Sequence, residues 1–382
     1  MPCSRRKLSA ITLALLAMIP SAVFAQTSAT NDPIGAQITP AIEGAMKAGN
    51  IPSLSIALVN KESVLWKGAF GYSNVLKKVP AETDTIYLIG STFKAQSTMA
   101  LLQLVDEGKI KLDDPVAQFI DPIKIEGEDS KNPIRVWHLL THSSGLPVDF
   151  GPHSVWGFSA PDSIDDYLKR KLKVDRLPET KYEYSNTAYQ LVAKIVETVG
   201  GMPYRSFIQT RLWERLKMND TAFVPRPNQY ERIAIPYTYN ESKSKHTPTD
   251  RVKADVWAAG IVYGTIEDQA KWLITNLNRG EYDGERIIKK STFKKMTSTQ
   301  FHAKEMNFHA LFGGPDATIG LTWWLKEENG EKHFAHSGSV PGYTAWITGN
   351  LDQGVGVAIL TNGNRSHPHI SKLADQALAL LK

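Results

Sequence analysis

The chain has 382 residues, of which 42% are hydrophobic and 22% are charged, as in an ordinary globular protein long enough to bury a large core. Its formal net charge is +5, and three of the positive charges lie at residues 5–7, in a segment that we expect to be removed. A processed chain with a net charge of about +2 gives no reason to expect nucleic acid or an anionic surface as a partner.

The first 25 residues have the pattern of an export signal. The Arg-Arg-Lys sequence at residues 5–7 precedes an apolar run at residues 8–19, and Ala25 provides a small residue at the cut. The run is short for a membrane span, which argues against an N-terminal anchor, and the arginine pair leaves the general and twin-arginine export routes open. The only cysteine, Cys3, would leave with this segment, so no disulfide, thiol nucleophile or cysteine metal site is expected. We expect a periplasmic or secreted bacterial protein whose processed chain has no stable membrane span.

The N-terminal elements predicted after this segment are a helix, a hairpin and a strand that leads into a second helix. Residues 34–48 have apolar side chains at helical spacing, and a glycine that can cap the helix follows them. Residues 53–59 alternate in polarity, and residues 64–72 follow as their hairpin partner. The apolar run 86–89 then ends in a glycine, and a helix with almost no charge begins near Ser91.

The middle of the chain, from about residue 101 to residue 250, is predicted to consist mostly of helices and loops. The predicted helices are a short one opened by residues 113–115 and others at 134–142, 187–200 and 202–216. Beyond them, Thr265 begins a capping pattern for a helix at 268–279.

Strand patterns return near the C-terminus, where β-branched and aromatic residues are separated by turns. The predicted strands lie at residues 321–325, 333–338, 343–347 and 354–361, and a helix at 368–381 closes the chain. The simplest assembly is an α/β fold of the α+β type, with an antiparallel sheet from both chain ends, flanking helices and an inserted, mostly helical subdomain.

This assembly implies one domain over residues 26–382. Its sheet subdomain would comprise approximately residues 34–90 and 255–382, and its helical subdomain approximately residues 91–254. Binding sites commonly lie at such a seam, so the polar motifs near these boundaries are candidates for function.

The first candidate pair is Ser91 and Lys94, which are three residues apart and therefore share one face of a helix. The first turn of a helix disfavours an ammonium group, and the apolar residues that follow require burial. A buried lysine there would lose its proton more readily than in water, and a neutral lysine beside a serine is a base beside a nucleophile. The same Ser-Thr-Phe-Lys sequence recurs at residues 291–294 among lysines and polar residues, where we interpret it as a capped surface helix.

The second candidate is Tyr184-Ser185-Asn186, at the entrance of the helix predicted at 187–200. A phenol can relay protons near a lysine, and an amide can both donate to and accept from a substrate amide. The alternative is that Asn186 caps the helix and Tyr184 packs in the core.

The third candidate is the end of a predicted strand, His336-Ser337-Gly338-Ser339. A glycine there lets a ligand lie close to the backbone, and the strand could bind an extended substrate and supply an N–H group to an oxyanion. The alternative is a strand that leads into a turn, with His336 a satisfied polar residue.

Taken together and in this order, the three motifs resemble the serine β-lactamase and penicillin-binding protein family, whose signature is S-x-x-K, a polar triplet and a K-T-G strand. Tyr184-Ser185-Asn186 is similar to the Y-x-N triplet of the class C β-lactamase and D-alanyl-D-alanine carboxypeptidase branch, and His336-Ser337-Gly338 to its H-x-G variant. Two further runs, at residues 139–147 and 258–262, are typical of that branch, so the resemblance covers essentially the whole processed chain.

The resemblance implies a role for each candidate residue. Ser91 would be the acylated nucleophile, and Lys94 and Tyr184 would share the proton transfers. Asn186 would bind the substrate amide, and the backbone N–H groups of Ser91 and Ser339 would bind the oxyanion. His336 and Ser337 would face the far end of the substrate, and Gly338 is a further substrate-binding residue of the same strand.

The resemblance also implies a serine hydrolase acting on a D-amino-acid peptide, a β-lactam or an ester, with no cofactor. True β-lactamases of this branch carry lysine where this chain has His336, and a neutral histidine is a poorer anchor for a carboxylate than an ammonium group. A carboxylesterase and a binding or sensor protein without turnover remain alternatives. His138 and His142 have a spacing that would suit a metal, but the glutamate of the zinc-protease pattern is missing, so no metal site is expected.

Overall fold

The computed structural model describes residues 32–148, 168, 172–174, 176–250, 257–302, 312 and 316–381. The predicted export segment with its cut near Ala25 lies outside the described residues, and so does most of the loops at 149–165 and 301–318. Among the described helices, none is both long and apolar enough to cross a membrane.

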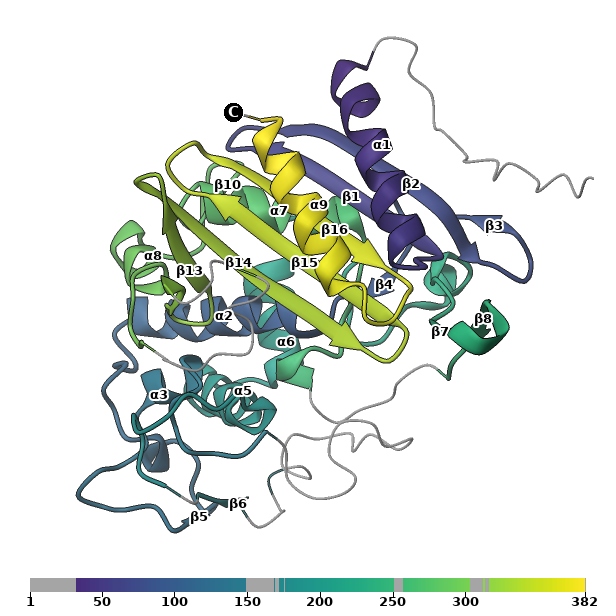
Figure 1. Ribbon diagram of the computed structural model, residues 1–382. Coiled ribbons are helices and arrows are strands. Elements are labelled where there is room, and N and C mark those ends of the chain that lie inside the picture. The colour runs from purple at the N-terminus through teal and green to yellow at the C-terminus, as the bar shows by residue number, and fades with distance from the viewer. Residues whose placement is uncertain are drawn as a thin grey trace, which may run out of the picture.

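An eight-stranded sheet, antiparallel throughout, dominates the described part of the chain (Figure 1). Its order is β12-β13-β14-β15-β16-β1-β2-β3, so the pairing of β16 with β1 joins strands from the two ends of the chain. This confirms the predicted sheet. The strands are β1 Ser53–Asn60, β2 Val64–Asn74, β3 Val79–Pro80, β12 Thr318–Ile319, β13 Trp324–Glu328, β14 Glu331–Val340, β15 Tyr343–Asn350 and β16 Val355–Thr361.

Helices cover both faces of this sheet. On one face, α1 Pro33–Ala48 and α9 His367–Ala379 lie side by side, as Figure 1 shows. Their apolar faces, which include Ile38 and Ile370, pack against alternate residues of the central strands, such as Ile56. On the other face, α7 Ile266–Leu277 packs against β1 and β16, and beyond it lie the helices of the middle of the chain.

The helices of the middle of the chain pack around α2 Lys94–Asp106, whose first eleven residues are all buried. That burial explains why its sequence is almost free of charge. Two of its buried polar side chains each make one hydrogen bond: Gln96 accepts one from the Trp213 indole at 2.7 Å, and Gln103 donates one to the Arg211 carbonyl at 3.1 Å. The other described helices are α3 Val136–Leu140, α5 Asn186–Gly200, α6 Tyr204–Ile208 and α8 Lys290–Met296.

Two features of the middle of the chain differ from the predictions. The helix predicted at 202–216 is divided, because α6 gives way to a π-helical turn at Gln209–Trp213. A hairpin of β7 Tyr237–Asn240 and β8 Lys245–Pro248 lies in the region that was predicted to consist mostly of helices and loops. The remaining short strands are β4 Tyr87–Leu88, β5 Ile125–Glu126, β6 Leu172–Lys173, β9 Tyr263–Gly264, β10 Glu281–Tyr282 and β11 Glu285–Arg286.

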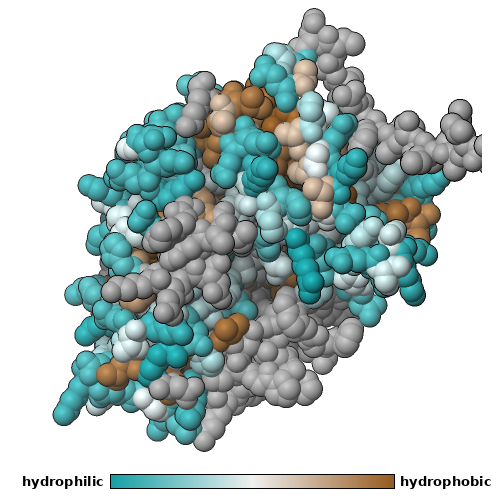
Figure 2. Space-filling model, in the orientation of Figure 1, coloured by the Kyte–Doolittle hydropathy of each residue, from teal (hydrophilic) through white to brown (hydrophobic). Residues whose placement is uncertain are grey.

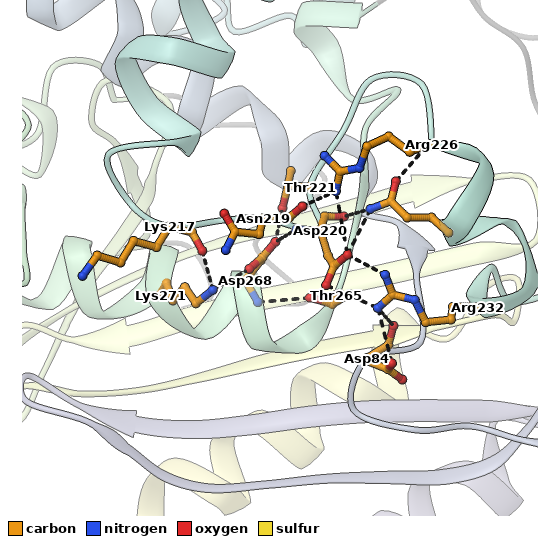
Figure 3. A network of polar contacts seen from close by, with 11 residues as sticks. Asp84, Lys217, Asn219, Asp220, Thr221, Arg226, Arg232, Thr265, Asp268 and Lys271 are labelled. Carbon is orange, nitrogen blue, oxygen red and sulfur yellow. Dashed lines mark hydrogen bonds and ion pairs between the residues drawn. The ribbon is translucent and has the colours of Figure 1, made fainter.

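A polar network ties the segment before β7 to α7 and to the chain before β4 (Figure 3). The buried carboxylate of Asp268 accepts hydrogen bonds from the Asp220 amide at 2.8 Å and from the Thr221 hydroxyl at 2.9 Å. Arg232 contacts the Asp220 carboxylate at 2.5 Å and Asp84 at 3.3 Å. The network thereby fixes the approach of β4, the strand that leads to Ser91.

The surface in Figure 2 is mostly hydrophilic, with apolar patches that include one between α1 and α9 and one near the turn between β2 and β3. Leu76 and Val79 are the exposed large apolar side chains of that turn. Isolated exposed apolar residues of this kind are ordinary on folded proteins.

Candidate active site

Ser91 lies in a single 3₁₀ turn, Gly90–Phe93, between β4 and α2. Gly90 has a φ of +56°, and a Cβ there would lie 2.7 Å from the Ser339 amide nitrogen. A Cβ on Gly338 would lie 2.1 Å from the Ile89 carbonyl oxygen. Only glycine fits at both positions. The backbone of the turn therefore packs directly against the backbone of β14, and the backbone N–H groups of Ser91 and Ser339 lie close together.

The Lys94 side chain is fully buried and points back toward Ser91. Its Nζ lies 3.0 Å from Ser91 Oγ, 2.8 Å from the amide oxygen of Asn186 and 2.7 Å from the Ala259 carbonyl oxygen. It also stands over the Tyr184 ring, 4.7 Å from the ring centroid. The structure therefore brings together the predicted serine and lysine, and adds Ala259 as a contact that sequence reasoning did not identify.

Tyr184 and Asn186 reach this cluster because α5 begins between them. Its N-cap is Ser185, whose hydroxyl accepts a hydrogen bond from the Ala188 amide at 3.0 Å. The alternative in which Asn186 caps the helix is therefore wrong. With the capping role taken by Ser185, the Asn186 amide points to Lys94.

His336 is buried at the side of the site and stacks on Trp324, with ring centroids 4.9 Å apart and planes at 18°. Its Nδ1 lies 2.7 Å from the Ser337 carbonyl oxygen. A carbonyl only accepts, so Nδ1 bears the proton of the neutral ring. Burial, and next the charge of Lys94, lower the pKa of His336 to about 3, so the ring is uncharged at neutral pH.

These groups surround a cavity of about 270 Å³. Of the predicted site residues, Lys94 and Gly338 lie behind its wall, since Lys94 is beneath Ser91 and Gly338 packs on the backbone of Ile89. The sequence reasoning did not assign Trp324 to the site, because an aromatic strand residue looks the same in a core as beside a ligand. The cavity is lined by Ser91, Tyr184, Asn186, Ala259, Gly260, Ile261, Trp324, His336, Ser337, Ser339 and Val340.

The second Ser-Thr-Phe-Lys copy lies on α8, where Ser291 and Lys294 are both exposed. This confirms the interpretation of that copy as a surface helix, but Ser291 does not cap it, because the N-cap residue is Lys289 and no side chain makes a capping hydrogen bond. The two histidines with metal-like spacing have separate partners, since His138 contacts Glu179 at 3.0 Å and His142 accepts from the Ser185 amide at 3.1 Å. Among the described residues, no group of three or more His, Cys, Asp or Glu side chains could hold a metal ion.

Comparison with known proteins shows the family to which this chain belongs. The beta-lactamase family model matches residues 38–382, and the chain belongs to that family. Among solved structures, an octameric penicillin-binding protein homologue from Pyrococcus abyssi has a TM-score of 0.75 and 29% identity over 91% of this chain and 77% of its own. A beta-lactamase/D-alanine carboxypeptidase from Yersinia pestis, complexed with citrate, has the same fold, with a TM-score of 0.75 and 22% identity over 92% of this chain and 98% of its own.

Curated relatives match over most of this chain but less of their own. Protein flp of Staphylococcus aureus strain MRSA252 is 27% identical over 87% of this chain and 63% of its own length. The unguisins hydrolase ungD' of Aspergillus campestris is 24% identical over 90% of this chain and 64% of its own length. The chain thus spans slightly less than two thirds of the length of these relatives.

Proposed function

We propose that this chain is an exported serine hydrolase that acts through an acyl-enzyme on amide, ester or lactam carbonyls. The observation that carries the proposal is the contact of the buried Lys94 amine with Ser91 and Asn186, two residues that line a cavity. Membership of the beta-lactamase family supports it, as do relatives named as a hydrolase and as a penicillin-binding protein homologue.

Acylation begins with removal of the Ser91 proton. A neutral amine has two N–H bonds and one lone pair, and the oxygens of Asn186 and Ala259 occupy the two N–H bonds of Lys94. The lone pair is then directed at the Ser91 hydroxyl, 3.0 Å away. Lys94, or Tyr184 as phenolate, takes the proton while Ser91 Oγ attacks the carbonyl carbon.

The oxyanion that forms is stabilised by the amides of Ser91 and Ser339, which the glycine contacts hold in one place before the substrate arrives. The leaving group receives its proton through Tyr184, whose ring lies under the Lys94 amine. Water then attacks the acyl-enzyme, and the same groups return the proton to Ser91.

The neutral His336 favours peptidase or esterase substrates over efficient β-lactam hydrolysis. A group with a pKa of about 3 carries no charge at neutral pH, so it cannot pair with a substrate carboxylate as an ammonium group does. Its stacking on Trp324 gives this end of the cavity an aromatic wall. We therefore propose a penicillin-binding or D-amino-acid peptidase, with carboxylesterase activity as the second candidate.

Labelling of the purified protein tests the nucleophile. A fluorophosphonate or a fluorescent penicillin should label the wild type and Ser291→Ala, whereas Ser91→Ala should not react. Loss of labelling in Ser291→Ala instead would overturn the assignment. Nitrocefin, p-nitrophenyl butyrate and a D-Ala-D-Ala peptide, assayed side by side, then separate the candidate activities, and a stable mass adduct without product would indicate a binding or sensor protein.

We also propose that residues 1–25 are removed during export and that the site lies at the seam of a sheet subdomain and a helical subdomain. The mass of the protein recovered outside the cytoplasm tests the first proposal. A mature N-terminus at Gln26 is the expected result, and a full-length, membrane-bound chain would contradict it.

A further inference from the structure

The run at residues 139–147 has no role in the proposed reaction, yet it lies along the segment that carries Tyr184 and Asn186. The Pro147 carbonyl accepts a hydrogen bond from the Ser185 hydroxyl at 2.7 Å. The carbonyl of the next residue, Val148, accepts one from the backbone N–H of Asn186 at 2.8 Å. The run therefore holds the entrance of α5 from outside the cavity.

His142 accepts hydrogen bonds from the backbone N–H groups of both residues next to Tyr184. Its carbonyl oxygen accepts a hydrogen bond from the Glu183 amide at 2.8 Å, and its ring Nδ1 accepts one from the Ser185 amide at 3.1 Å. Its ring also lies against the Tyr184 ring, with centroids 4.4 Å apart and planes at 31°. One residue thus fixes both neighbours of Tyr184 and one side of its phenol ring.

The backbone and protonation state of His142 both suit this arrangement. Its φ is +56°, a left-handed conformation that is uncommon outside glycine, asparagine, aspartate and histidine. Because a backbone N–H donates to Nδ1, that atom bears the lone pair and Nε2 bears the proton. Burial holds the pKa of His142 well below its usual range, so the accepting form persists.

The Nε2 atom of His142 is buried and has no hydrogen-bond partner among the described residues. A buried polar atom without a partner costs free energy, so packing alone does not account for a histidine at this position. What histidine adds is the Nδ1 acceptor for the Ser185 amide. We infer that His142 is a positioning residue, which sets the Tyr184 phenol beneath the Lys94 amine for proton transfer.

This inference rests on the proposed function, and a double-mutant cycle with Tyr184→Phe tests it. His142→Phe keeps an aromatic ring but removes the acceptor. We expect it to lower the rate of Ser91 acylation about 10- to 100-fold in the wild-type background and less than about threefold in the Tyr184→Phe background, because only the phenol is misplaced. An equal loss in both backgrounds, or no loss in either, would show that His142 is structural only.

The control variant is His138→Phe, which makes the same substitution four residues earlier in the chain. His138 contacts Glu179 and the Arg135 amide rather than the neighbours of Tyr184. Its effect on acylation should therefore be equal in the two backgrounds. Coupling as strong as that of His142 would contradict the inference.

A second pair covers the case in which His142→Phe does not fold. Asparagine tolerates a positive φ, and its Oδ1 stands where Nδ1 stands in histidine, so His142→Asn should acylate at least fivefold faster than His142→Ala. Equal rates would refute the inference.

A crystal structure of the alanine variant adds a readout that does not depend on activity. A Tyr184 ring that stays in place would refute the positioning role, whereas a wild-type Ser91 that never labels would instead refute the proposed function.

Discussion

The replacement of Lys94 by methionine is the sharpest test of the proposed chemistry. Methionine retains much of the side-chain length and can occupy the same buried channel, but it has no nitrogen. The hydrogen bonds of Nζ at 3.0, 2.8 and 2.7 Å are all lost, and with them the base directed at Ser91. A positioned general base contributes about 10²- to 10⁴-fold, so acylation by a fluorophosphonate should slow by at least about 100-fold at neutral pH.

The same replacement has a calculable effect on stability. The oxygens of Asn186 and Ala259 lose a buried donor, at a cost of about 1–3 kcal/mol each. The gain from no longer burying an amine offsets part of this loss, so we expect a net destabilisation of about 1–3 kcal/mol in urea unfolding. The folded fraction at assay temperature therefore stays high, and a 100-fold slower reaction cannot be ascribed to unfolding.

The assay compares initial labelling rates of Lys94→Met with those of Lys294→Met, the same change in the exposed copy of the motif. The control should react like the wild type. If Lys94→Met labels within tenfold of the wild-type rate while remaining folded, the lysine is not the base. Tyr184, or another group, would then have to activate Ser91 alone.

Three further predictions follow from the geometry. Gly90→Ala should lower acylation at least tenfold, since its Cβ would lie 2.7 Å from the Ser339 amide nitrogen; an unchanged rate would contradict the proposed oxyanion contacts. His336→Lys should raise kcat/KM for a peptide with a free carboxylate relative to its amide, and an unchanged ratio would show that this position does not select the substrate. The hydrogen bond from Arg232 lowers the pKa of the Asp220 carboxyl in the folded protein. The pair therefore stabilises the fold fully at pH values above about 4, the pKa of an aspartate in the unfolded chain. This stabilisation is lost as the pH falls through the lower pKa of Asp220 in the folded protein. Arg232→Met should therefore cost about 1 kcal/mol at pH 7 in urea unfolding and progressively less as the pH is lowered below about 4, and a cost that does not change with pH would refute this account.

The sequence predicted those features that depend on neighbouring residues. The pairing of Ser91 with Lys94 follows from a spacing of three residues, and the exposure of Ser291 follows from the lysines around it. The sheet was predicted because residues 53–59 alternate in polarity and the C-terminal strands are rich in β-branched and aromatic residues separated by turns. The short β7–β8 hairpin was missed because four-residue polar strands have too few residues for a pattern to emerge.

Features that depend on distant residues could not be derived from local patterns. Ser185 and Asn186 are both good helix caps, and only the position of Lys94 shows which of them faces the site. The stacking of His336 on Trp324 requires the register of β13 against β14. His142 was noticed for its spacing from another histidine, but its actual partner is the Ser185 amide, more than forty residues further along the chain.

The pairing of β16 with β1 has a consequence for how the molecule is built. During synthesis, the hairpin of β1 and β2 appears first, and a two-stranded hairpin is marginal by itself. Its neighbour on the other side, Val355–Thr361, is made only after nearly three hundred further residues. The meeting of Ser91 with Ser339 must therefore wait until β14 has been made, and completion of the sheet until β16 has been made. Closing this long loop costs conformational entropy before the contacts between β1 and β16 can form. We therefore expect the sheet to fold slowly after synthesis rather than to assemble during it.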